Sequence, residues 1–114
     1  MNDRAIVNPE VFEGLREIME DDFSDIVAAF HNQAQEMWPQ AATALAAEEY
    51  AVVERIAHGL KGSALSLGAE QLSDILESLE RAAREANLPL IQAQHETADA
   101  RLVETIEWVT TAMA

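Results

Sequence analysis

The sequence predicts an all-α protein: an up-down-up-down antiparallel four-helix bundle with a short extra helix at its N-terminal side. Three observations lead to this prediction. Apolar residues recur at the helical period in four long segments and one short segment. The connections between these segments are short, so successive helices should run antiparallel. No segment alternates apolar and polar residues as a half-buried strand would.

Composition sets the first limits on function. The 114 residues are the length of one domain, which we expect to span residues 1–114 with a loose tail over residues 1–7. The formal net charge of -14 argues against nucleic acids and anionic membranes as partners, because both would be repelled. There is no cysteine, no apolar run of about 20 residues and no secretion signal, so we expect a cytoplasmic protein.

The first two helices have recognisable starts. Asn8, Pro9 and Glu10 are typical of an N-cap followed by a first helical turn, and this short helix should cover one end of the bundle. Its expected buried face consists of Val11, Leu15 and Ile18. Asp21 and Asp22 predict the cap of the second helix. The stripe of that helix consists of Phe23, Ile26, Val27, Phe30, Ala34, Met37, Ala41 and Leu45.

Pro39 interrupts the second helix without changing the phase of its apolar stripe. We therefore predict one kinked helix, and a break at Trp38 is the alternative. Trp38 and Trp108 are both interpreted as packing residues.

The remaining helices follow after short connections. The third helix is expected over residues 51–67, with Gly68 at the C′ position, and the fourth over residues 69–86. Asn87, Leu88 and Pro89 form the last turn before the final helix. The fourth helix should bury Leu72, Ile75, Leu76, Leu79 and Ala83, and the last should bury Ile91, Ala98, Leu102, Val109 and Met113.

The third helix has an unusual exposed side. Its apolar stripe consists of Val53, Ile56, Ala57, Leu60, Ala64 and Leu67, and His58 lies well off this stripe. The neighbours of His58 on the helical wheel are small or apolar, apart from one lysine; they are Ala51, Lys61, Gly62 and Leu65. A solvent-facing surface normally carries long charged side chains, so this pattern indicates a surface kept open.

Two glycines support that interpretation. A mid-helix glycine costs about 1 kcal/mol relative to alanine, which applies to both Gly59 and Gly62. Close packing against a neighbouring helix is the usual reason for such a glycine. Gly62, however, lies on the exposed side one turn from His58, so we interpret it as clearance for a large group that approaches the imidazole.

At these residues the sequence resembles the histidine phosphotransfer (HPt) domain family. The family motif is a histidine, a lysine–glycine pair three and four residues later, a small residue and a further glycine at the helix end. His58, Lys61, Gly62, Ser63 and Gly68 match it. Phe30 and the pair Leu79-Glu80 also stand where the family has these residues, and the resemblance extends over about residues 23–85.

The resemblance implies a phosphocarrier in a multistep two-component phosphorelay. Its partners would be receiver domains of hybrid histidine kinases and response regulators, which bring an aspartyl phosphate and Mg²⁺, so this chain would bind no cofactor itself. His58 would accept the phosphoryl group and pass it on, Lys61 would offset its charge, and Gly62 would leave room for the partner. Ser63 and Arg84 are supporting candidates, and Ala51 and Leu65 would belong to the docking patch.

Other interpretations concern the remaining polar residues. Arg84 also fits an ordinary surface pair with Glu80, which is the favoured interpretation. His31 is expected in solvent and His95 at the core edge with its hydrogen bonds satisfied, and we expect no metal site. The chain has no glycine-rich phosphate loop, so no ATP-dependent kinase activity is expected. The alternative function is a non-phosphorylated helical adaptor using the same patch, and in either role the chain is expected to be a monomer.

Overall fold

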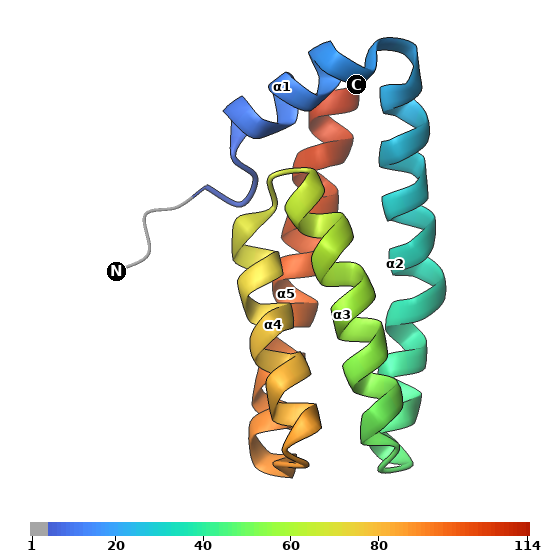
Figure 1. Cartoon of the computed structure of the whole chain (residues 1–114), viewed down its shortest axis with the longest axis vertical. Coiled ribbons are helices and arrows are strands. Elements are labelled where there is room, and N and C mark those ends of the chain that lie inside the picture. Colours follow the sequence, from blue (N-terminus) through green and yellow to red (C-terminus); the bar gives the residue numbers. More distant parts are fainter. Residues whose placement is uncertain (1–4) are drawn as a thin grey trace.

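The computed structural model describes residues 5–114, in which every regular element is a helix (Figure 1). The elements are α1 (Pro9–Met19), the single 3₁₀ turn η1 (Glu20–Asp22), α2 (Phe23–Ala46), α3 (Tyr50–Ser66), α4 (Glu70–Arg84) and α5 (Leu88–Met113). Helices α2 to α5 form an up-down-up-down bundle, and α1 lies across one of its ends (Figure 1). Helix α3 packs against both α2 and α4, and α4 packs against α5. The predicted fold class is therefore confirmed, and none of the helices in residues 5–114 is long and apolar enough to cross a membrane.

Helix α1 begins as predicted but buries a different face. The side chain of Asn8 caps it by accepting a hydrogen bond from the backbone N–H of Glu10 at 3.0 Å. Phe12 is fully buried, and its ring packs edge-on against Phe23 and Trp108, with ring centroids 5.0 Å apart in both pairs. The predicted face was wrong for Val11 and Ile18, which are 38% and 78% exposed, whereas Leu15 packs against the core as predicted. Because α1 crosses the bundle end, the aromatic residues at that end select its buried side. The face predicted from the sequence was Val11, Leu15 and Ile18.

The turn between α3 and α4 requires a glycine, as predicted. Gly68 has a left-handed φ of 86°, and the N–H of Ala69 donates to the carbonyl of Ala64 at 2.9 Å, which closes helix α3. The N–H of Asn8 donates to the Gly68 carbonyl at 2.8 Å, so the start of α1 is attached to this turn. A Cβ at Gly68 would lie 3.0 Å from the Asn8 carbonyl oxygen and from the Val11 side chain.

Helix α2 is continuous through Pro39, so the alternative of a break at Trp38 is wrong. The preceding turn η1 replaces the expected cap, because the side chain of Asp22 makes no capping hydrogen bond. Trp38 is buried, which confirms its packing role. The predicted apolar stripe of α2 is either buried or packed against the core, and Ala44 joins it.

Helices α2 and α5 meet through one aromatic contact. The rings of Trp38 and His95 stack with centroids 4.7 Å apart, and the Trp38 indole N–H donates to Asp99 Oδ1 at 2.8 Å. Burial lowers the pKa of His95, and the nearby Asp99 carboxylate offsets this only in part. His95 Nε2 is buried and has no hydrogen-bond partner within residues 5–114, so the expectation of a satisfied histidine was wrong. Stacking on Trp38 is what holds this ring at the core edge.

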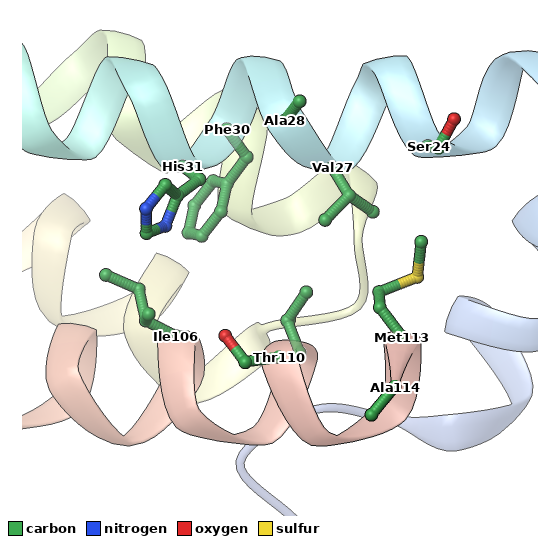
Figure 2. Close-up of a pocket in the computed structure, with 10 residues that line it drawn as sticks. Ser24, Val27, Ala28, Phe30, His31, Ile106, Thr110, Met113 and Ala114 are labelled. Atoms are coloured by element: carbon green, nitrogen blue, oxygen red, sulfur yellow. The ribbon is translucent and has the colours of Figure 1, made fainter.

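Towards the α1 end, α2 and α5 leave an open apolar groove of about 450 Å³ between them (Figure 2). His31 lies next to Phe30 in this groove and is only partly exposed, which corrects the expectation of a solvated side chain. The groove is lined by Ser24, Val27, Ala28, Phe30, His31, Ile106, Val109, Thr110, Met113 and Ala114.

Candidate functional site

Helix α3 presents His58 to solvent because its opposite face is the centre of the bundle. The residues of its predicted apolar stripe, from Val53 to Leu67, are all buried. His58 lies off this stripe, and its side chain is 69% exposed. The amphipathic pattern of the helix therefore places the imidazole on the flank of the bundle.

A buried carboxylate on the neighbouring helix holds the imidazole. Glu80 of α4 is only 7% exposed, and its Oε2 atom lies 3.0 Å from His58 Nδ1. A carboxylate accepts hydrogen bonds, so this contact places the ring proton on Nδ1. The nucleophilic lone pair is then on Nε2, for which the described chain provides no hydrogen-bond partner. The contact fixes both the tautomer and the direction of the ring.

Two cations share the same carboxylate. Lys61 Nζ donates to Glu80 Oε1 at 2.8 Å, and Arg84 Nη2 donates to Glu80 Oε2 at 3.2 Å. Burial raises the pKa of Glu80, but the hydrogen bonds from Lys61 and His58 and their charges outweigh burial and lower it. Glu80 therefore stays ionised at neutral pH and positions the groups around it.

Arg84 forms the i,i+4 pair with Glu80 that was the favoured interpretation of the sequence, and it makes one contact that the sequence did not suggest. Its Nε atom also donates to Glu54 Oε2 of α3 at 2.9 Å, so it joins α3 and α4 in addition to pairing with Glu80. Together with Lys61, Glu77, Glu80 and Arg81, it lines a cleft of about 70 Å³ between the two helices. This cleft has room for a few water molecules but is too small for a nucleotide.

Gly62 and Ser63 differ in what surrounds them. A Cβ at Gly62 would meet nothing within 4 Å, so no packing within the described chain requires this glycine. Ser63 is half-buried, and its hydroxyl donates to Gln33 Oε1 of α2 at 2.6 Å. Ser63 therefore contributes to the α2–α3 contact and points away from the open side of His58. Gly59 faces the same glutamine, because its Cβ would lie 3.4 Å from Gln33 Nε2.

The predicted docking residues lie on the open face. Leu65 is 57% exposed, and Ala51 is also exposed. With His58 and Gly62 they form a surface along α3 that includes small and apolar side chains. These residues leave the imidazole uncovered along this part of α3.

Sequence reasoning did not assign Glu80 to the site. In the sequence analysis, Glu80 was named only as part of a Leu-Glu pair and as a surface partner of Arg84. The available signal was that Glu80 follows Leu79 by one residue and precedes Ala83 by three, so it borders the apolar stripe of α4. No group of three or more His, Asp or Glu side chains suited to a metal ion occurs within residues 5–114.

Comparisons with known proteins agree with this geometry. The sequence matches the Hpt domain family over residues 25–110, about three quarters of the chain. The fold is similar to the crystal structure of histidine-containing phosphotransfer protein B (HptB) from Pseudomonas aeruginosa PAO1, with a TM-score of 0.88, 23% identity, and coverage of 94% of this chain and 93% of that one. No curated protein matches the sequence significantly. The family match, over a bundle of the same shape, shows that the chain belongs to the Hpt domain family, the histidine phosphotransfer domains of phosphorelays.

Proposed function

We propose that His58 is the phosphoacceptor through which this protein takes part in a phosphorelay. The observation that supports this most strongly is an imidazole that is 69% exposed and whose Nδ1 is held by a buried carboxylate. The Nε2 lone pair attacks the phosphorus of a receiver's aspartyl phosphate. The new N–P bond forms as the P–O bond to the aspartyl carboxylate breaks, and the Nδ1 proton stays in its hydrogen bond to Glu80. The reverse step transfers the group to the aspartate of a second receiver.

Lys61 and Gly62 would support this step in different ways. Lys61 is one helical turn from His58, and its ammonium group would offset charge on the phosphoryl oxygens while Glu80 keeps it in place. Gly62 would leave space for the loops of the receiver, which supports in-line approach to Nε2. In this scheme Ser63 and Arg84 act through other residues: Ser63 through its contact with α2, and Arg84 through its contact with Glu80.

In this proposal, the protein is a phosphate carrier without ATP-dependent kinase activity of its own. Receiver domains of hybrid histidine kinases and response regulators would be its partners, and they would supply both the aspartate and Mg²⁺. It would bind them one after another as a monomer in the cytoplasm, through the surface that includes Ala51 and Leu65. A non-phosphorylated adaptor would use the same surface but would never carry phosphate.

A transfer assay with all three histidines distinguishes these functions. The protein is mixed with a phosphorylated receiver and Mg²⁺, and protein-bound phosphate that is acid-labile and base-stable is measured. We expect such label on the wild type, on His31→Gln and on His95→Gln, and none on His58→Gln. Label that persists on His58→Gln would refute the assigned acceptor. Absence of label from the wild type with every receiver of the same source would favour the adaptor.

A further inference from the structure

Arg55 is a cation next to the site, and no charged partner for it occurs among the residues that the structure describes. It is exposed on α3, three residues before His58, and it forms no ion pair with any residue from 5 to 114. Several other basic residues of this chain do lie against carboxylates, as Arg16, Lys61, Arg84 and Arg101 show. Arg81 on α4 is likewise exposed and has no ion pair within residues 5–114, so what distinguishes Arg55 is its position on α3 beside His58.

Helix geometry places Arg55 and Lys61 on opposite flanks of His58. Residues three positions away on either side point about 60° from the histidine, in opposite directions around the helix. Lys61 is on the α4 flank, where Glu80 holds it. Arg55 is on the other flank, in the direction of Gly59, whose neighbour is Gln33 of α2. The two cations thus border the exposed imidazole from both sides, but only Lys61 is neutralised.

The direction of the side chain indicates what Arg55 would contact. In a helix, side chains lean towards the N-terminus, so we expect the Arg55 side chain to extend towards Ala51, one turn earlier, and away from His58. Ala51 is small and exposed, so it leaves that side chain accessible. Arg55 is therefore placed to meet the surface of a docked protein around the reacting group, and not the transferred phosphoryl group itself.

Charge complementarity identifies the kind of surface that would meet it. A domain that holds Mg²⁺ next to an aspartyl phosphate needs carboxylates at that point, so its docking face is anionic. The carrier is itself strongly acidic, so it repels such an anionic face at long range. An unpaired arginine at the contact offsets that repulsion locally and favours the orientation in which His58 faces the phosphate.

We propose that Arg55 is a docking residue that pairs with acidic side chains of the receiver domain beside its phosphorylated aspartate. It determines how often productive encounters occur and leaves the chemical step unchanged. The inference rests on the proposed phosphotransfer function, and it assigns to Arg55 a role separate from those of Lys61 and Gly62.

The test compares three substitutions in rapid-quench phosphotransfer assays at low salt. Arg55→Gln should lower kcat/KM about three- to tenfold and Arg55→Glu should lower it further, with the rate at saturating receiver unchanged. The difference in kcat/KM between the wild type and the Arg55 variants should decrease as added salt screens the charges. Arg101→Gln is the matched control, because it makes the same change in net charge on α5 and should leave kcat/KM close to wild type.

Other outcomes would overturn the inference. Equal kcat/KM for Arg55→Gln and Arg101→Gln at low salt would show that only overall charge matters. A lower rate at saturating receiver would show that Arg55 acts in the chemical step. Circular dichroism of the variants excludes loss of helix as the cause. Failure of wild-type protein to accept phosphate refutes the proposed function instead, and the His58→Gln assay detects that separately.

Discussion

Replacing Gly62 with alanine should stabilise the protein and yet slow phosphotransfer. The added Cβ would meet nothing within 4 Å, so no repacking cost opposes the gain in helix propensity. That gain is about 1 kcal/mol for a mid-helix glycine, which corresponds to a rise in Tm of roughly 4 °C for a domain of this size. The same methyl group would project into the open side next to His58. We expect it to slow transfer by about tenfold or more, because small displacements of reacting groups are costly.

Gly14 provides a matched control on helix α1. A Cβ there would also meet nothing within 4 Å, so Gly14→Ala should give a comparable increase in stability. Urea denaturation followed by circular dichroism measures both stabilities, and rapid-quench assays with one phosphorylated receiver measure both transfer rates. We expect the two variants to agree in stability and to differ in transfer.

Two results would refute this reasoning. Transfer at the wild-type rate by Gly62→Ala would show that the receiver does not need the space above this residue. A loss of stability in Gly62→Ala, with a gain in Gly14→Ala, would show that Gly62 has a packing role within the bundle.

Three further predictions concern the charged groups. Glu80→Ala should shift His58 from the tautomer with its proton on Nδ1 towards the other tautomer and slow its phosphorylation about 10- to 100-fold; an unchanged ¹⁵N NMR spectrum of the ring would contradict the positioning role. Lys61→Ala should shorten the lifetime of the phosphohistidine or reduce transfer while helicity is retained; a loss of circular dichroism signal would instead identify Lys61 as structural. Burial lowers the pKa of His95 in the folded state. At pH values just below the ordinary pKa of 6.5, the unfolded chain therefore binds more protons than the folded protein does. Stability should therefore decline as the pH falls below about 6.5, and His95→Phe should weaken that decline in urea titrations at pH 7.5 and 5.5; identical pH profiles would contradict this assignment.

The long helices could be predicted from the sequence because each has one continuous partner surface. The stripes of α3 and α4 are long enough for the helical period to identify their buried sides, and Gly68 marks the turn between them by its backbone alone. Helix α1 shows where this reasoning fails. It has three turns and crosses the end of the bundle, so the position of Trp108 in α5 decides that Phe12 is buried.

Part of the candidate site could also be predicted from the helical period. His58, Lys61 and Gly62 lie on one helix, so their spacing places them on a shared face, and the structure has them there. The role assigned to each stays a prediction. Glu80 could not be assigned in this way, because a buried carboxylate is tolerated only where cations from another helix reach it. That information depends on how α4 is rotated against α3, which periodicity does not specify.

The groups proposed for the chemistry, His58, Lys61, Gly62 and Glu80, all belong to one hairpin, α3 and α4. Both tryptophans lie elsewhere, Trp38 on α2 and Trp108 on α5. Their fluorescence would therefore report the state of the scaffold independently of events at the imidazole. An engineer could redesign the groove between α2 and α5, for example to attach a dye or a tether, and keep the reactive hairpin as it is.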